Sequence, residues 1–159
     1  MAARNSATSE SAKRALVIER IFDAPRSLVF EAWTKPEHLR NWFCPKGFTV
    51  PACEMDFRIG GRYRLCMRSA EGREHLVHGE YREIVAGERI VFTGILEADG
   101  NEILTTITLA DHHGKTKLVV HQTYSFESDS TRGAPQGWTE TLERLDAYVA
   151  NNLINNLKE

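Results

Sequence analysis

The chain has 159 residues, of which 42% are hydrophobic and 26% are charged, and its formal net charge is −2. These values are typical of one folded domain, and the slight negative charge argues against a general binder of nucleic acid or of anionic membranes. No apolar run approaches the roughly 18–20 residues of a membrane-spanning helix. We therefore expect neither nucleic acid nor a membrane as a partner.

The beginning of the chain and its cysteines bear on its location. Residues 1–13 are small and polar and lack the apolar region of a signal peptide, so we expect a flexible tail ahead of a single domain over residues 14–159. The three cysteines, Cys44, Cys53 and Cys66, form no CxxC pair. An odd number of cysteines without close pairing is typical of reduced, buried thiols. Together these features predict a cytoplasmic protein.

The first predicted element is a strand over residues 14–22, a segment rich in β-branched side chains. A short helix is expected to follow it. Either Asp23 or Ala24 would cap this helix, because Pro25 is suited to a first helical turn. The apolar face of the helix would consist of Leu28, Val29, Ala32 and Trp33.

A second short helix is expected after Thr34. Thr34 and Glu37 have the spacing of a capping box, and Pro36 stands at an early helical position. The turn-forming sequence at 45–47 would end this helix. Its apolar side would consist of Leu39, Trp42 and Phe43.

From Val50 onward the hydrophobic period changes to two, which indicates half-buried strands. Turn signals such as Gly60-Gly61 and Asp99-Gly100 separate these strands. Hairpins this tight require antiparallel neighbours, so with the first strand they predict an antiparallel sheet of about seven strands. The later strands are expected at 50–57, 62–68, 75–85, 90–96, 103–109 and 117–126.

The last predicted element is a long helix from Ala134 to about Asn155, reached through a polar loop at 128–133. On the side of this helix opposite its apolar stripe, Glu140 and Arg144 have the spacing of a helical ion pair. A helix this amphipathic needs a large apolar surface, which a curved sheet would supply. Its apolar stripe consists of Trp138, Leu142, Leu145, Val149 and Leu153.

Candidate catalytic and metal-binding residues are few. His75 and His78 lie on one predicted strand at a spacing that points them to opposite faces, so we expect no metal site. Glu54 and Asp56 share a strand face and have the chemistry of a general acid and base. The alternation places them on the outer face of the sheet, and it places His121 on a sheet surface too.

A set of motifs occurs in a recognisable order along residues 16–150. They are Val29-Phe30-Glu31-Ala32-Trp33, Pro36, Trp42-Phe43, the segments 56–63, 78–81 and 89–93, Gly137-Trp138, Leu142 and Leu145. In these positions the chain resembles the START-like, Bet v 1-like (SRPBCC) superfamily, in the branch named for the activator of Hsp90 ATPase. The resemblance implies an α+β helix-grip fold, in which a curved antiparallel sheet wraps around a long C-terminal helix. One departure is Cys44, which stands where a glycine is usual.

The resemblance also implies an elongated apolar cavity between the concave face of the sheet and the long helix. Its expected ligand is a hydrophobic small molecule of the lipid, polyketide or aromatic type. Gly79 and Gly94 favour this reading, because glycine within a strand often marks a bend or the close approach of a ligand. The same residues could instead form a packed core. The expected lining residues are Trp33, Phe43, Tyr63, Met67, Tyr81, Phe92, Gln122, Tyr124, Trp138, Thr141 and Leu142.

We expect ligand binding without catalysis, and neither a cofactor nor a metal. Two alternatives stay open: an enzyme of the cyclase or dehydratase type using the same cavity, and a protein-interaction module associated with Hsp90. The resemblance argues against the second, because the eukaryotic activator makes its main chaperone contact through a separate N-terminal domain that does not fit in 159 residues. A homodimer through an exposed sheet edge also stays open.

Overall fold

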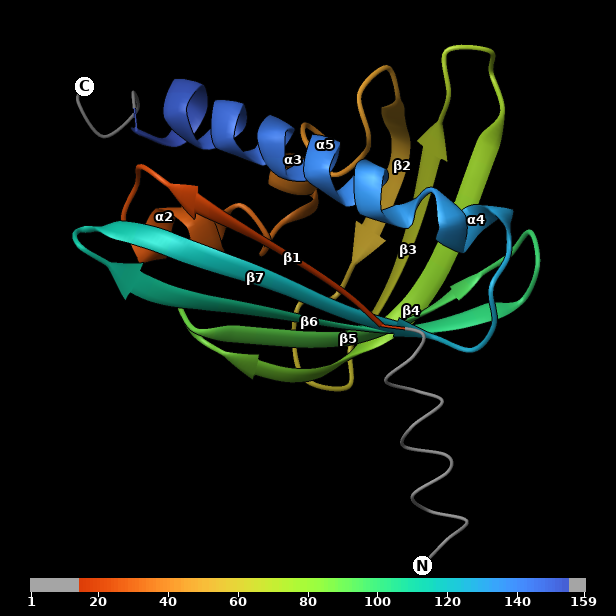
Figure 1. Ribbon diagram of the computed structural model, residues 1–159, viewed down its shortest axis with the longest axis horizontal. Coiled ribbons are helices and arrows are strands. Elements are labelled where there is room, and N and C mark those ends of the chain that lie inside the picture. Colours follow the sequence, from red (N-terminus) through yellow and green to blue (C-terminus); the bar gives the residue numbers. More distant parts are fainter. Residues whose placement is uncertain (1–14, 155–159) are drawn as a thin grey trace, which may run out of the picture.

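The computed structural model describes residues 15–154 (Figure 1). The expected N-terminal tail at 1–13 and the expected helical end at Asn155 lie outside these residues. Within the described range, no helix combines the length and the apolar character needed to cross a membrane.

The described chain forms one antiparallel sheet of seven strands, in the spatial order β1-β7-β6-β5-β4-β3-β2. This arrangement confirms the predicted sheet. Apart from the pairing of β1 with β7, every pair of neighbours in the sheet is consecutive in the chain. The strands are β1 (Ala15–Phe22), β2 (Thr49–Met55), β3 (Arg62–Arg68), β4 (Glu74–Val85), β5 (Arg89–Leu96), β6 (Asn101–His112) and β7 (Lys115–Tyr124).

The strand register separates an inner face, which packs against the C-terminal helix, from an outer face. Phe92 of β5 pairs with Thr105 of β6, and Thr105 pairs with Gln122 of β7, so these three side chains share the inner face. All three are buried. Most of the hydrophobic core therefore lies on this side of the sheet, and its fully buried side chains include Phe22, Ile90, Ile107, Leu118 and Val120.

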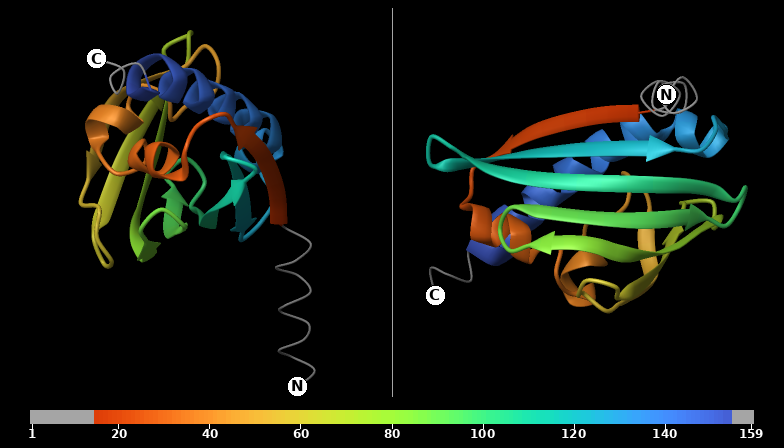
Figure 2. Two further views of the ribbon diagram at one scale, coloured as in Figure 1. Left: turned by 90° about the vertical axis from the view of Figure 1, so that its left-hand side faces the viewer. Right: turned by 90° about the horizontal axis from the view of Figure 1, so that it is seen from below.

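The C-terminal helix α5 (Ala134–Tyr148) lies across the open side of the curved sheet (Figure 2). It continues as a π-helical segment, η1 (Val149–Ile154). All five residues of the predicted apolar stripe are buried, which confirms the helix register. On another side of α5, Asp146 forms an ion pair with Arg20 of β1 at 3.0 Å and so ties the helix to the edge strand. The helix-grip arrangement expected from the sequence is confirmed.

The two short helices exist, but their predicted caps are wrong. In α2 (Arg26–Glu31) the N-cap is Pro25 itself, so neither Asp23 nor Ala24 occupies that position. A proline fits here because its fixed φ is compatible with the extended conformation of an N-cap residue. The helix therefore begins at Arg26, directly after the proline, and Pro25 is not part of its first turn.

The capping box predicted for the second helix does not form. Helix α3 (Pro36–Leu39) has Lys35 as its N-cap, with no side-chain capping bond. The hydroxyl of Thr34 instead donates to the backbone oxygen of Glu31 at 2.8 Å, at the end of the preceding helix. Threonine side chains often bond to nearby backbone in this way. Because the Thr34 hydroxyl bonds to Glu31, it does not cap α3. The helix also ends at Leu39, so Trp42 and Phe43 lie beyond it.

The segment expected to be a loop at 128–133 contains a further short helix, α4 (Asp129–Arg132). Ser128 and Thr131 form reciprocal side-chain and backbone bonds at its start, including a bond of 2.8 Å from the Ser128 amide to the Thr131 hydroxyl. This is a capping box with threonine where glutamate or glutamine is usual. The substitution conceals the helix from a search for the ordinary pattern.

Candidate functional site

A small apolar cavity lies between the inner face of β3 to β5 and the two short helices. Its volume is about 20 Å³, which leaves room for roughly one water molecule. None of its lining residues comes from α5, so it does not occupy the expected position beneath the long helix. The residues that line it are Trp33, Leu39, Phe43, Phe57, Tyr63, Leu65, Tyr81, Ile90 and Phe92.

Several separate segments supply these side chains. Trp33 follows α2, Leu39 ends α3, and Phe57 follows β2. Phe43 lies between α3 and β2, and the other walls come from β3, β4 and β5, where period-two alternation points every second residue toward the core. The cavity is therefore a product of tertiary packing, because no single element carries more than two of its walls.

Aromatic rings packed edge to face dominate the walls. Trp33 contacts Phe43 with ring centroids 5.9 Å apart, and Phe57 contacts Tyr81 at 5.0 Å. Tyr81 in turn contacts Phe92 at 6.1 Å. Such arrangements favour binding of a further apolar or aromatic group, because they offer ring edges and faces but little conformational freedom.

Two phenol groups belong to this lining. The Tyr63 hydroxyl donates to the backbone oxygen of Thr93 at 2.6 Å. Burial raises the pKa of both Tyr63 and Tyr81 above the ordinary value for a phenol. Both groups therefore remain protonated at neutral pH and can act as hydrogen-bond donors rather than as bases.

The structure brings part of the expected site together. Among the eleven residues predicted from the sequence, the cavity is lined by Trp33, Phe43, Tyr63, Tyr81 and Phe92. Sequence reasoning missed Leu39, Phe57, Leu65 and Ile90 as lining residues. All four stand on predicted apolar faces, but periodicity alone does not show which apolar residues border an unfilled volume.

The other predicted residues are not among the lining residues: Met67, Gln122, Tyr124, Trp138, Thr141 and Leu142. Two of these residues have polar side chains whose hydrogen-bond partners lie outside the cavity lining. The Gln122 amide donates to the Thr105 hydroxyl at 2.8 Å, and the Thr141 hydroxyl donates to the backbone oxygen of Gly137 at 2.7 Å. Trp138 stacks on Trp33 at 6.5 Å and thus lies behind the cavity wall.

The mid-strand glycines have a structural explanation that involves no ligand. A Cβ atom on Gly79 would lie 1.9 Å from the backbone oxygen of Thr93 on the neighbouring strand. One on Gly94 would lie 2.9 Å from the Tyr63 hydroxyl and 2.8 Å from Ile103. Both glycines therefore permit close packing between strands and side chains, and they give no support to a cavity.

The candidate acid and base residues lie on the outer face. Glu54, Asp56 and His121 are exposed, and the ring nitrogen Nδ1 of His78 lies 3.1 Å from a carboxylate oxygen of Glu97. Three of them, Glu54, Asp56 and His78, line a broad, open hollow of about 870 Å³ on the outside of the sheet. Apart from the phenols of Tyr63 and Tyr81, no ionisable side chain lines the inner cavity. Among residues 15–154, no group of three or more His, Cys, Asp or Glu side chains could hold a metal ion.

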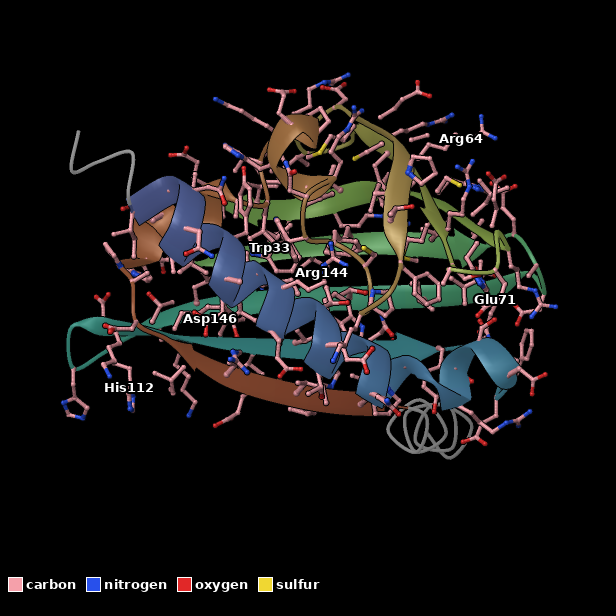
Figure 3. All side chains as sticks on the ribbon, turned by 90° about the horizontal axis from the view of Figure 1, so that it is seen from above. Trp33, Arg64, Glu71, His112, Arg144 and Asp146 are labelled. Carbon is pink, nitrogen blue, oxygen red and sulfur yellow. The ribbon has the colours of Figure 1, made fainter. Side chains whose placement is uncertain are left out.

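Residues 41–48, which we call the closing segment, carry one cavity wall, Phe43, and are fastened to α5. The Arg144 guanidinium donates to the backbone oxygens of Phe48 at 3.1 Å and of Asn41 at 3.4 Å. Glu140 accepts a bond from the Lys46 amide at 3.2 Å. Figure 3 shows Arg144 on the side of α5 that faces Trp33, whereas Asp146 lies toward β1.

These bonds replace the ion pair that the sequence predicts between Glu140 and Arg144. Among the described residues the two side chains form no ion pair, because each reaches the closing segment instead. Unpaired backbone groups in an irregular segment need partners, and a charged side chain satisfies them strongly. The pair therefore fixes a loop rather than stabilising its own helix.

The fold has counterparts among known proteins. Residues 23–150 match the family described as "Activator of Hsp90 ATPase homolog 1-like protein". No curated protein matches the chain significantly.

Solved structures of similar proteins share most of the fold. A protein of Chromobacterium violaceum is 31% identical, with 86% of this chain and 97% of that chain covered and a TM-score of 0.81. A protein of Rhizobium leguminosarum is also 31% identical, covers 87% of this chain and 95% of its own, and has a TM-score of 0.72. An AHSA1 protein of Silicibacter pomeroyi is 24% identical, with coverage of 86% and 97% and a TM-score of 0.76, and shows likeness of fold alone.

Proposed function

This chain belongs to the family of activator of Hsp90 ATPase homolog 1-like proteins, and from that premise we propose that it binds a small hydrophobic molecule beneath its two short helices. The family fold supports a ligand-binding role in general terms. The proposed ligand is of the lipid, polyketide or aromatic type, and its proposed position is the cavity between β3–β5 and the short helices. No catalytic step is proposed.

The observation that carries this proposal is the chemical character of the cavity walls. All nine lining residues are aliphatic or aromatic, and the only polar atoms of their side chains are two phenol oxygens and one indole nitrogen. Ligand sites for small organic molecules have this composition: mostly apolar walls with a few placed polar groups. A cavity walled in this way favours an apolar ligand with limited hydrogen bonding.

Binding requires the cavity to widen, because about 20 Å³ is far less than an organic ligand occupies. The walls contributed by sheet strands are held by hydrogen bonds on both sides. Leu39 of α3 and Phe43 of the closing segment lie outside the sheet, and only local backbone bonds and the bonds from α5 hold their segments. Movement of these residues away from the sheet is the least costly route to a larger cavity.

A cavity enzyme of the cyclase or dehydratase type finds no support in the same walls. General acid and base catalysis needs groups with a pKa near the working pH within reach of the substrate. The two tyrosines have a pKa raised by burial, and Glu54, Asp56, His78 and His121 lie on the outer face. Binding without chemistry is the simpler function for these residues.

Calorimetric titration tests this proposal with three kinds of probe: a fatty acid, a flavonoid and a single-ring aromatic compound. We expect at least one to bind, and to raise the unfolding temperature because it binds only the folded state. Leu65→Phe, which fills the cavity with a larger side chain, should abolish that binding. Val17→Phe is the matched control, since Val17 is 59% exposed on the outer face. Binding that survives Leu65→Phe unchanged would place the ligand elsewhere.

A further inference from the structure

The indole nitrogen of Trp33 is a buried hydrogen-bond donor without a partner in residues 15–154. The side chain is only 3% exposed, so solvent does not satisfy this donor. The neighbouring Trp42 shows the ordinary situation, since its indole N–H donates to the backbone oxygen of Ala32 at 3.0 Å. Buried donors are almost always paired, and one that is not calls for a specific explanation.

Trp33 is also a wall of the inner cavity. Its ring is packed against Trp42 at 4.7 Å, Phe43 at 5.9 Å and Trp138 at 6.5 Å, and these neighbours offer it aromatic surface. The unfilled volume that Trp33 borders is the place where an acceptor could be added. Trp33 thus carries both an unpaired buried donor and one wall of the cavity.

The other polar groups in the walls differ in what they can offer. The Tyr63 hydroxyl proton is already used in the bond to Thr93. The Tyr81 hydroxyl, which belongs to another lining residue, makes no hydrogen bond to any residue in the range 15–154. None of the nine lining side chains carries a charge. A carboxylate or ammonium group in this cavity would therefore be buried without a counter-ion, at a high cost in free energy.

We infer that Trp33 is the polar anchor of the ligand, and that its indole N–H donates to a neutral oxygen acceptor on a compact aromatic molecule. This inference rests on the proposed function. It selects one class among the hydrophobic ligands considered: an aromatic ketone or a similar neutral carbonyl compound. A fatty acid does not fit it, because the walls provide no cation for the carboxylate and little length for the chain.

The test is a thermodynamic cycle with two probes and two proteins. The probes are acetophenone and ethylbenzene, which have similar shapes but differ in the carbonyl oxygen. Trp33→Phe keeps an apolar ring and removes the N–H. Calorimetric titration of each pair gives the ratio of the ethylbenzene Kd to the acetophenone Kd. Comparing this ratio between proteins cancels the different hydration of the two probes.

We expect the ratio to fall by about 5- to 10-fold from the wild-type protein to Trp33→Phe, as for the loss of one buried hydrogen bond. Trp138→Phe is the matched control, because Trp138 packs behind the cavity wall and should leave the ratio unchanged. If Trp33→Phe does not fold, benzothienylalanine at position 33 replaces it, since sulfur there preserves the ring shape and removes the donor.

The outcomes separate the inference from the proposed function. If both probes bind the wild-type protein and the ratio is the same in Trp33→Phe, the proposed function stands and the anchor is overturned. If neither probe binds, both are overturned for aromatic ligands. A crystal of the wild-type protein soaked in acetophenone provides a direct view. A single water on the indole nitrogen, with no probe in the cavity, would also overturn the anchor.

Discussion

The three tryptophans show how local surroundings give one residue type different roles. Trp42 is fully buried and its N–H is satisfied by backbone, so it stabilises the short helices as an ordinary core residue. Trp138 of α5 stacks on the ring of Trp33 with an interplanar angle of 22°, so it packs the helix against the cavity wall. Trp33 alone combines burial, an unpaired donor and a cavity. Whether the indole N–H has a hydrogen-bond partner thus separates Trp42, which packs in the core, from Trp33, for which we propose a role in ligand binding.

Truncation of Trp138 tests its packing role. We expect Trp138→Ala to lower the free energy of unfolding by about 3–5 kcal/mol, because large aromatic truncations in a core lose transfer free energy and leave a cavity. Urea titration followed by circular dichroism measures the change. Phe126→Ala is the control, since Phe126 is 39% exposed, and it should cost less than about 1 kcal/mol. A similarly small loss for Trp138→Ala would contradict the packing described above.

Ionisation of buried groups predicts a loss of stability in alkaline solution. Burial is the main reason why the pKa of the Cys53 thiol rises from 9.0 to about 11. Between these values the unfolded chain loses the thiol proton and the folded chain keeps it. The unfolded state then binds fewer protons, so the free energy of unfolding decreases as the pH rises above about 9.

Urea titrations between about pH 8 and about pH 11 measure this effect. Cys53→Ala removes the thiol, so its free energy of unfolding should decrease less steeply, by at most about 1.4 kcal/mol per pH unit. The tyrosines of the cavity are present in both proteins, and burial, which Cys53→Ala leaves in place, is the main cause of their raised pKa. Parallel curves for the two proteins would show that Cys53 ionises equally well in the folded state.

At the scale of elements, the sheet and the short helices owe their stability to different sources. The strands pair along their length, and α5 buries a continuous stripe. Helices α2 and α3 have only 6 and 4 residues, and neither has a side-chain capping bond. Helices this short are not stable alone, because nucleation is unfavourable and few bonds follow it. Aromatic packing must hold them in place, and the bonds from Arg144 hold the closing segment that follows α3.

The close contact between β4 and β5 supplies a prediction for the sheet. Gly79→Ala should lower the free energy of unfolding by about 1–3 kcal/mol, because the new methyl group meets a backbone oxygen that has little freedom to move. Gly133→Ala is the matched control: its Cβ would lie 4.0 Å from the nearest atom, and its φ is −84°. We expect a change of less than about 0.5 kcal/mol there. Thermal unfolding of both variants measures the two changes in the free energy of unfolding. Equal changes would contradict the steric explanation.

Periodicity, together with turn signals and β-branched residues, identified all the strands and α5, because alternation and the 3.6-residue repeat record burial directly. It was less successful where a side chain has several partners to choose from. Thr34 bonds backward to Glu31 instead of capping α3, and Arg144 bonds to the closing segment instead of to Glu140. Helix α4 was not predicted, because Thr131 stands where a capping box usually has glutamate. These choices depend on neighbours that only the folded chain provides.

At the scale of the whole molecule, the sequence indicates which side chains enter the core but not where the core is incompletely filled. Tyr63, Tyr81 and Phe92 were predicted to point inward, and they do line the cavity. The remaining volume is set by how α2, α3 and the closing segment meet the sheet, which no periodicity describes. Trp138 and Leu142, which were expected to line a site under α5, are buried, and the cavity is lined by residues of other segments.

A cavity of about 20 Å³ is too small for the proposed ligand and so predicts slow, gated ligand binding. If the closing segment must leave the sheet before a ligand enters, the observed binding rate should level off at high ligand concentration, at the opening rate of the segment. Stopped-flow fluorescence of the tryptophans near the cavity measures this rate for any probe that binds. Arg144→Ala removes the bonds from α5 to Asn41 and Phe48 and so destabilises the closed state.

In Arg144→Ala the limiting rate should rise about 5-fold or more, as expected when bonds from a charged donor contribute at least about 1 kcal/mol to the closed state. Glu143→Ala is the matched control, because Glu143 is an exposed neighbour on the same helix. Hydrogen exchange should accelerate in residues 41–48 of Arg144→Ala and remain unchanged in β6 and β7, since only the segment loses its attachment. A binding rate that increases linearly with concentration in all three proteins would show that the cavity is open without movement of the segment.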